Sequence, residues 1–239
     1  MGIRATIING CIGLLFRVLC RIQDSDLRRL PLKGPAILIT NHTSNIEGPL
    51  FYVRLRPRAT IAMAKIELWK FFATRMIMEA WGAIPLRRGR LDRKALAKCV
   101  RVLDDGNFLC IAPEGKRSKD GTLLRGQPGA TWFAADKGIL IYPMVQWGCL
   151  DIFHELSHLR RPRVTIKVGR PFLVRTPVGS HVHGDELQAM ADEMMYEMAE
   201  LLPQRYRGYY SDTSKKTTKY LEFVSKDNPD GKSPRGDVE

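Results

Sequence analysis

The chain has 239 residues, of which 44% are hydrophobic and 26% are charged, and its formal net charge is +13. This length and composition suit one folded α/β domain and exclude a chain that is disordered throughout. Residues 211–239 hold six basic and six acidic side chains, so the whole excess of positive charge lies in residues 1–210. The folded part should therefore attract anionic lipids, acidic proteins or phosphate groups.

The first predicted element is an N-terminal helix. Residues 5–16 carry no charge, arginines flank them, and no acidic residue precedes Asp24. Twelve helical residues extend about 18 Å, which is short of the roughly 30 Å of a bilayer core. We expect residues 1–29 to form a membrane-associating helical segment that lies at the interface of a cytoplasmic membrane face. The alternative is an amphipathic helix packed on the protein's own core.

The remaining elements are expected to alternate between strands and helices. Short apolar runs predict strands at residues 36–40, 60–64, 83–86, 108–112, 139–145 and 164–168. The clearest helices are predicted at residues 92–103, 127–137 and 185–202. This order predicts a single α/β domain at residues 30–210, with a mixed or mostly parallel sheet covered by helices. The polar segment at residues 211–239 is expected to be a disordered tail.

A second apolar stretch runs from Ile66 to Trp81 and is rich in Trp, Phe and Met. It holds too many large side chains for a one-sided surface helix. We expect it in the core, and a position facing lipid or an acyl chain is the alternative.

The most informative motif is Thr-Asn-His-Thr-Ser-Asn-Ile-Glu at residues 40–47. It places His42 directly after an apolar strand, and a helix is expected to begin near Ser44. A histidine on this turn can fold back onto the carboxylate of Glu47, and an imidazole held in this way can take a proton from a hydroxyl group. Ser44 and Glu47 also fit a capping box, in which the glutamate binds backbone N–H groups, so capping is the alternative role.

Four short blocks follow one another along the chain. They are Asn41–Glu47, which contains His42, then Gly82–Arg88, Ala112–Ser118 and Ile141–Val145. In this order and spacing the chain resembles the glycerolipid acyltransferases, and it is similar to the 1-acylglycerol-3-phosphate acyltransferases over residues 30–210. It departs from the usual pattern at Glu47, where the family has aspartate, and at Lys116, where the family has threonine.

The resemblance implies a reaction. His42 would deprotonate the free hydroxyl of lysophosphatidate, and the oxygen would attack an acyl thioester carried by coenzyme A or acyl carrier protein, giving phosphatidate for phospholipid synthesis. Glu47 would fix the tautomer of the imidazole and stabilise its charged form. Free N–H groups at the helix start are expected to face the oxyanion of the intermediate. The acyl thioester is a co-substrate, and no metal or bound cofactor is expected.

The resemblance also implies the residues that contact the substrates. They are Asn41, Arg88, Glu114, Gly115, Lys116, Arg117 and Pro143. Arg88 and Arg117 are expected to bind the phosphate of the acceptor, because a planar guanidinium can make two parallel hydrogen bonds to phosphate oxygens.

Other functions compete with this one. The acceptor could be another lysophospholipid or glycerol 3-phosphate. The glutamate at position 47 also allows a catalytically weakened, lipid-binding relative. A nucleic acid partner is not expected, because the basic chain has no recognisable reading module or aromatic platform.

Two further patterns bear on metal binding and compartment. His154-Glu155-Leu156-Ser157-His158 matches the HExxH zinc signature, which needs a stable helix. This segment lies between two predicted strands and comes close to Pro162, so we expect no zinc site. The five cysteines lack metal-ligand spacing and predict a reducing compartment.

Overall fold

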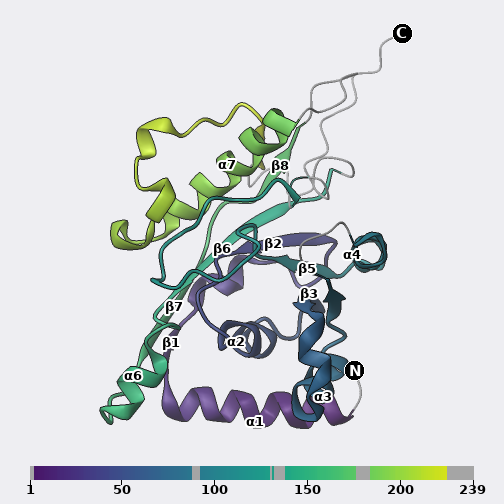
Figure 1. The fold of residues 1–239 in the computed structure, drawn as a ribbon, viewed down its shortest axis with the longest axis vertical. Coiled ribbons are helices and arrows are strands. Elements are labelled where there is room, and N and C mark those ends of the chain that lie inside the picture. Colours follow the sequence, from purple (N-terminus) through teal and green to yellow (C-terminus); the bar gives the residue numbers. More distant parts are fainter. Residues whose placement is uncertain (1–2, 88–91, 130, 132–137, 176–183, 225–239) are drawn as a thin grey trace.

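The computed structural model describes residues 3–87, 92–129, 131, 138–175 and 184–224, and its centre is one mixed sheet (Figure 1). The strands are β1 (Arg21–Gln23), β2 (Ala36–Thr40), β3 (Thr60–Lys65), β4 (Ile84–Leu86), β5 (Phe108–Ile111), β6 (Ile141–Trp147), β7 (Arg163–Val168), β8 (Phe172–Val174) and β9 (Leu221–Phe223). Their order across the sheet is β1-β7-β6-β2-β5-β3-β4, and β8 pairs with β6 and β9.

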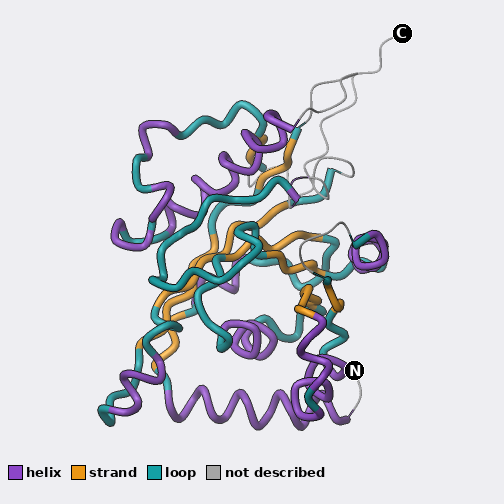
Figure 2. Tube along the Cα trace, in the orientation of Figure 1, coloured by secondary structure: helices purple, strands orange, loops and turns teal. Residues whose placement is uncertain are grey.

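Helices flank the sheet on both sides. They are α1 (Ile3–Leu19), α2 (Glu47–Arg54), α3 (Phe72–Ala80), α4 (Arg93–Asp104), α6 (Ile152–Ser157) and α7 (Gly184–Leu201). Short 3-10 segments are η1 (Ser25–Arg29), η2 (Ile66–Lys70), η3 (Gln204–Tyr206), η4 (Gly208–Tyr210) and η5 (Thr213–Lys215). In Figure 2 the strands run through the middle of the molecule between these helices.

Five neighbouring strands are parallel, and their register decides where a site can form. Ile37 of β2 lies opposite Leu109 of β5 and Ile141 of β6. The strands β3 and β4 continue the parallel part of the sheet, whereas β7 is antiparallel to β6. The carboxyl ends of β6, β2, β5 and β3 therefore meet at one edge, which is where ligands gather in such sheets.

The alternating side chains of β2 serve two hydrophobic cores. Ile37 and Ile39 belong to the core formed with α4 and α7, whereas Ala36 and Leu38 belong to the core formed with α2 and the end of α1. All five residues of β2 are buried, as is expected for a strand covered on both faces. The predicted α/β class and mostly parallel sheet are confirmed.

The helix α1 packs on the protein's own core, which was the alternative to a membrane-associating segment, and it also exposes apolar side chains. One face packs on the domain, where Trp81 donates a hydrogen bond of 2.9 Å from its indole N–H to Asn9 Oδ1. The other face exposes Ile7, Leu14 and Val18, each to about 60%. Residues 20–30 also join the second core and supply β1, so the N-terminal segment is not separate from the domain.

The expected core position of residues 66–81 is wrong for most of that stretch. No residue of η2 or α3 is buried, and Phe71 and Phe72 are 69% and 82% exposed. Trp81 alone follows the expectation, since it is buried and its ring stacks on Tyr52 at 4.3 Å. The exposed large apolar side chains of the run are Phe71, Phe72 and Met76, and its other large apolar side chains before Trp81 are half-buried.

Other differences come from long-range pairing. The predicted disordered tail begins too early, because β9 pairs with β8 and Tyr220 and Leu221 are buried. The short elements β1, β8 and α6 were not predicted, and β6 extends two residues past its predicted end at residue 145. Most of the predicted helix at residues 127–137 lies outside the described residues.

Candidate active site

The histidine and the glutamate of the first motif form a direct pair. His42 Nδ1 lies 2.7 Å from Glu47 Oε2. Because a carboxylate only accepts hydrogen bonds, Nδ1 carries the proton and Nε2 keeps a free lone pair, as a general base requires. The imidazole side chain is 28% exposed and the carboxylate 3%, so a substrate can reach the histidine but not its partner.

The second oxygen of Glu47 binds the start of the helix. Oε1 accepts hydrogen bonds of 2.7 Å from the backbone N–H groups of Thr43 and Ser44. It also accepts from the hydroxyl of Thr43 at 2.5 Å and from the amide of Gln146 at 2.7 Å. Glu47 therefore orients the imidazole with one oxygen and caps the turn with the other, so both roles considered from the sequence are present.

The start of α2 explains how a glutamate fits a position where aspartate is usual. The helix begins at Glu47 itself, three residues later than the expected start at Ser44. Ser44 Oγ accepts from the N–H of Ile46 at 3.1 Å and so closes a tight turn ahead of the helix. The extended turn leaves room for the extra methylene of Glu47, whose carboxylate still reaches back to His42.

Hydrogen bonds of Asn41 and Gln146 connect this turn to β6. Asn41 exchanges hydrogen bonds with the backbone of Gln146, since Asn41 Nδ2 donates to the carbonyl at 2.8 Å and Asn41 Oδ1 accepts from the N–H at 2.9 Å. The Gln146 side chain then donates to both Thr43 Oγ1 and Glu47 Oε1. Asn41 is 1% exposed, so it positions the turn and does not contact substrate as the resemblance implied.

Glu114 has a similar positioning role. Its carboxylate is 2% exposed and accepts from the backbone N–H of His42 at 2.9 Å and of Leu124 at 2.8 Å. The Ser118 N–H donates to the His42 carbonyl at 2.8 Å, so the loop after β5 binds the backbone of His42 from both sides. The implied contact between Glu114 and substrate is therefore corrected to a contact with the histidine backbone.

Burial makes Glu114 sensitive to pH. Desolvation raises the pKa of its carboxyl to about 7, and the two backbone N–H donors offset only part of this effect. The folded protein then binds this proton more tightly than the unfolded chain, so this group's contribution to stability falls as pH rises from about 4.5 to about 7. The full difference is roughly 3 kcal/mol.

This predicts that the free energy of unfolding of the wild type drops between pH 4.5 and pH 8 relative to that of Glu114→Gln. Urea unfolding of both proteins at several pH values measures the difference. Parallel pH curves for the two proteins would contradict the assignment.

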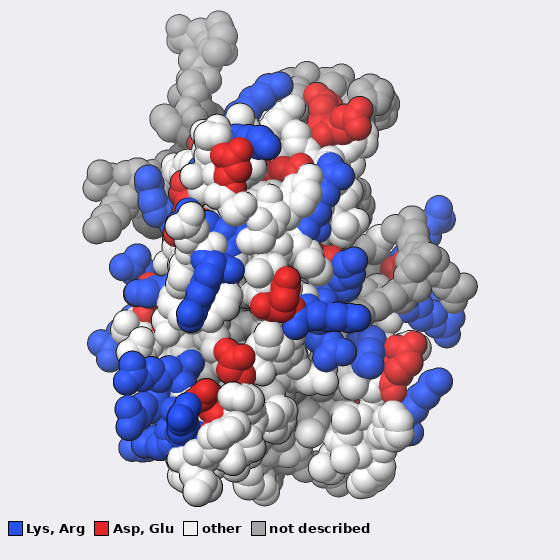
Figure 3. Space-filling model, turned by 60° about the vertical axis from the view of Figure 1, so that its left-hand side comes forward, with Lys and Arg blue, Asp and Glu red and all other residues white. Residues whose placement is uncertain are grey.

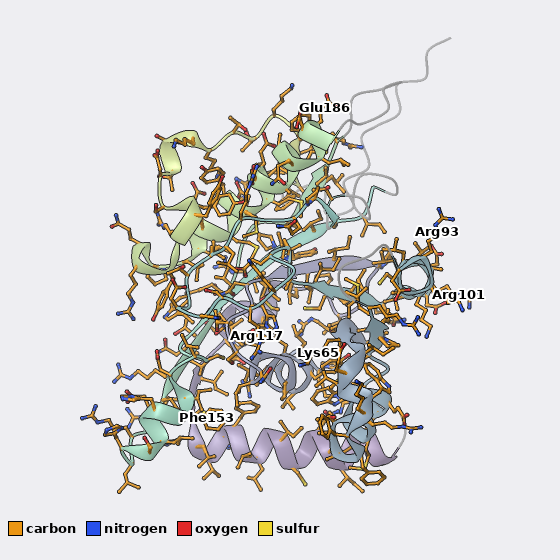
Figure 4. All side chains as sticks on the ribbon, in the orientation of Figure 1. Lys65, Arg93, Arg101, Arg117, Phe153 and Glu186 are labelled. Atoms are coloured by element: carbon orange, nitrogen blue, oxygen red, sulfur yellow. The ribbon has the colours of Figure 1, made fainter. Side chains whose placement is uncertain are left out.

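Cations surround the same edge of the sheet. Lys116 and Arg117 are exposed on the loop after β5, and Gly115 at its start adopts φ +68°, which glycine allows. Lys65 ends β3, three residues after Ala62, which pairs with Cys110 of the neighbouring β5, and Figure 4 labels Lys65 and Arg117 beside the end of α2 in this view. Arg88, the other expected phosphate ligand, lies outside the described residues.

Two expectations about this site need correction. Pro143 is buried within β6, where its carbonyl accepts from the Gly169 N–H, so it does not face a substrate. The N–H groups of Thr43 and Ser44 bind Glu47 and are not free for an oxyanion. The sequence predictions also missed Thr43, Gln146 and Lys65, of which only Lys65 has a signal, because it directly follows the predicted strand at residues 60–64.

The HExxH segment forms only the six-residue helix α6. The rings of His154 and His158 lie 4.6 Å apart and are tilted by 42°, and His158 Nδ1 binds the carbonyl of His154. Within the described residues, no group of three or more His, Cys, Asp or Glu side chains is placed to hold a metal ion. The helix ends at Ser157, so His158 lies just past its last residue.

A buried carboxylate that orients a strand-end histidine, with basic side chains at the same edge of a mostly parallel sheet, defines a class of α/β proteins equipped for proton abstraction from a hydroxyl. The Acyltransferase family profile matches residues 21–147, which is more than half of the chain. The chain belongs to this acyltransferase family.

Similar proteins are phospholipid acyltransferases by name. The 1-acyl-sn-glycerol-3-phosphate acyltransferase of Limnanthes douglasii is 30% identical over 171 residues, which cover 67% of this chain and 57% of that protein. The chloroplastic 1-acyl-sn-glycerol-3-phosphate acyltransferase LPAT1 of Arabidopsis thaliana is 25% identical over 185 residues, covering 75% of this chain and 49% of its own. The chain spans about half the length of these curated relatives.

A solved structure shows the same fold. The PlsC acyltransferase of Thermotoga maritima matches with a TM-score of 0.57 and 20% sequence identity, over 79% of this chain and 75% of its own. At this identity the match supports the architecture of the sheet and helices.

Proposed function

We propose that the protein transfers a fatty acyl group from an acyl thioester to the free hydroxyl of lysophosphatidate, which gives phosphatidate. The observation that carries the proposal is the pair of His42 and Glu47 in a member of the acyltransferase family, with Nε2 free to accept a proton. The names of the similar plant proteins favour this acceptor.

The chemistry needs one base and no bound cofactor. His42 Nε2 takes the proton of the acceptor hydroxyl as its oxygen attacks the thioester carbonyl, and Glu47 stabilises the imidazolium. The tetrahedral intermediate then expels the thiolate, which receives the proton from the imidazolium. Ester and free thiol are the products, and the histidine returns to its starting state.

Mass spectrometry of the reaction of purified protein with lysophosphatidate and a long-chain acyl thioester tests the function. We expect phosphatidate with at least one of the two donor types, acyl-CoA and acyl carrier protein. Absence of product with both donors would contradict the assigned acceptor. Product formed from glycerol 3-phosphate or another lysophospholipid would then reassign the acceptor, and vesicle binding without any turnover would indicate a lipid-binding relative.

Arg117 is proposed to bind the acceptor phosphate. It lies next to Ser118, whose N–H donates to the carbonyl of His42, and its side chain is exposed. We expect Arg117→Ala to raise KM for lysophosphatidate by about 10-fold or more, because a charge-assisted hydrogen bond contributes roughly 1.5–3 kcal/mol. Steady-state kinetics measure this, with Lys119→Ala on the same loop as the control. An unchanged KM would exclude Arg117 from the phosphate site.

The protein is also proposed to bind the cytoplasmic face of a membrane with anionic lipids. Every helix in the described part of the chain is too short or too polar to span a bilayer. The helices α1 and α3 lie at one end of the molecule, and Figure 3 shows that this lower end is largely uncharged on the visible face, with basic side chains beside it. Exposed apolar side chains flanked by cations suit an anionic lipid surface.

Phe72 provides the test of membrane binding, because it is 82% exposed and contributes little to the core. We expect Phe72→Asp to lower the affinity for anionic vesicles, measured by sedimentation, by about 10-fold. The substitution removes apolar area that would be buried in the membrane and adds a negative charge that anionic lipids repel. The thermal unfolding temperature should change little. Glu67→Asp on the preceding η2 segment is the control, and unchanged vesicle binding by Phe72→Asp would place the membrane contact elsewhere.

A further inference from the structure

A groove runs along one end of the sheet, on a single face of three strands. In the parallel pair of β1 and β7, Arg21 lies opposite Arg163 and Gln23 lies opposite Thr165. Thr165 in turn lies opposite Trp147 of β6. Because side chains alternate across a sheet and register partners share a face, these five side chains point to the same side.

Segments distant in sequence close this face into a cavity of about 930 Å³. The helix α6 with the loop that follows it forms one wall, and Arg205 and Tyr206 of η3 form another. A volume of this order fits a drug-sized or cofactor-sized ligand.

The groove leads to the candidate active site. A second cavity of about 330 Å³ shares with it Trp147, Gly148, Asp151, Arg205 and Tyr206. This smaller cavity is also lined by Thr43, which is bonded to Glu47 and follows His42 in the chain. The two cavities therefore adjoin each other, and the smaller one reaches Thr43, the neighbour of His42 in the chain.

The groove is strongly basic. Five arginines line it, against the acidic Asp151 and Glu155. Arg161 donates to the carbonyls of Arg17 and Cys20 and so has a structural role. Arg160 and Arg163 are exposed, and neither has a carboxylate within ion-pair distance among the described residues. These cations can bind an anion without first breaking an ion pair.

A second basic cavity, of about 660 Å³ near η1, adjoins the groove at Gln23 and Thr165, but it does not share a lining residue with the cavity that reaches Thr43. Its Arg54 pairs with Asp24, its Lys167 lies 3.6 Å from Asp26, and its Arg58 donates to several backbone carbonyls. Arg54 also lies at the far end of α2 from Glu47, away from the site. Positive charge by itself therefore does not distinguish the groove from this second cavity, but the lining residues that the groove shares with the cavity at Thr43 do.

We propose that this groove, lined by Arg160 and Arg163, binds the phosphate-bearing nucleotide end of a coenzyme A thioester and directs its arm through the smaller cavity to His42. This rests on the proposed acyl transfer and names the donor for it. Arginines bind phosphates with two parallel hydrogen bonds, and Trp147, half-buried at the end of β6, offers an aromatic surface to a flat base, whereas the Tyr206 ring already lies under the Arg205 guanidinium at 4.7 Å. A concave cavity suits a small phosphorylated ligand better than the surface of a folded acidic carrier protein.

Comparing a full acyl donor with one that lacks the nucleotide tests this subsite independently of the catalytic centre. The double variant Arg160→Gln/Arg163→Gln should lose about 10- to 100-fold in kcat/KM with palmitoyl-CoA, the range expected when charge-assisted hydrogen bonds are removed. With palmitoyl-pantetheine, which has the same thioester but no nucleotide, it should match the wild type. The control Lys98→Gln/Arg101→Gln removes equal charge from α4, on the other side of the molecule from α6, and should behave like the wild type with both donors (Figure 4).

Several outcomes would overturn the subsite. The first is a groove variant that loses kcat/KM equally with palmitoyl-CoA and with palmitoyl-pantetheine. The second is an α4 control that loses as much as the groove variant, and the third is a groove variant with no loss of kcat/KM. The last is a groove variant whose loss appears only with acyl carrier protein as donor or only in vesicle binding. If the wild type shows no turnover with any donor, the proposed function fails, and calorimetry with adenosine 3′,5′-bisphosphate still decides the groove. Binding by wild type and the α4 control but not by the groove variant would support the subsite, and absence of binding to the wild type would overturn it.

Discussion

His42→Ala is expected to lower the rate of acyl transfer by about 10²- to 10⁴-fold, the range that a positioned general base contributes. Its imidazole is the one accessible member of the pair with Glu47, so no neighbour can take over the proton. The fold should persist, because the backbone of His42 keeps its hydrogen bonds to Glu114 and Ser118. Product formation from lysophosphatidate and an acyl thioester measures the loss.

The control is His154→Ala, which removes an exposed histidine from α6 and should leave turnover unchanged. Vesicle binding and the unfolding temperature of His42→Ala should match those of the wild type. If turnover persists in His42→Ala, another group is the base and the proposed mechanism is wrong.

Glu47→Gln is expected to reduce both activity and stability. An amide in this place must present either its NH2 group or its oxygen to His42 Nδ1. If NH2 faces the imidazole, the ring shifts to the tautomer with a proton on Nε2 and cannot act as a base, which by analogy with catalytic triads lowers kcat by up to about 10⁴-fold. If the oxygen faces the imidazole, NH2 faces the donors of Thr43, Ser44 and Gln146 and leaves them unsatisfied.

The expected loss of stability is about 1–3 kcal/mol, the cost of leaving buried donors without an acceptor. Kinetics and urea unfolding of the same preparation measure the two effects together. Glu67→Gln, at an exposed position of η2, is the control and should change neither quantity appreciably. If Glu47→Gln loses stability but keeps full activity, Glu47 acts only as a cap of the turn. If it loses activity but keeps full stability, the capping hydrogen bonds of Glu47 contribute little to stability.

The sequence identified the reactive pair because its two members are close in the chain. His42 and Glu47 are five residues apart, on a turn whose strand and helix are both encoded locally. The residues that hold this turn were not predictable in the same way. Gln146 reaches Glu47 across 99 positions of sequence and Glu114 reaches His42 across 72, so only strand register brings them together.

The same distinction separates the correct from the incorrect fold predictions. The buried strands β2, β5 and β6 are continuous apolar runs and were found, whereas β1, β8 and β9 are three residues long and exist only because a neighbouring strand pairs with them. The apolar pattern of α3 could not distinguish the core from an exposed apolar surface, because both require the same residue types.

By itself the sequence determined the α/β class, the histidine with its carboxylate and the order of the four blocks, since each depends on local pattern and spacing. The tertiary structure alone decided that Glu47 shares its two oxygens between His42 and the helix start, and that Asn41 and Glu114 hold the backbone of the site. It also decided which apolar faces remain exposed. These outcomes depend on which strands become neighbours and in what register, and local sequence does not encode that choice.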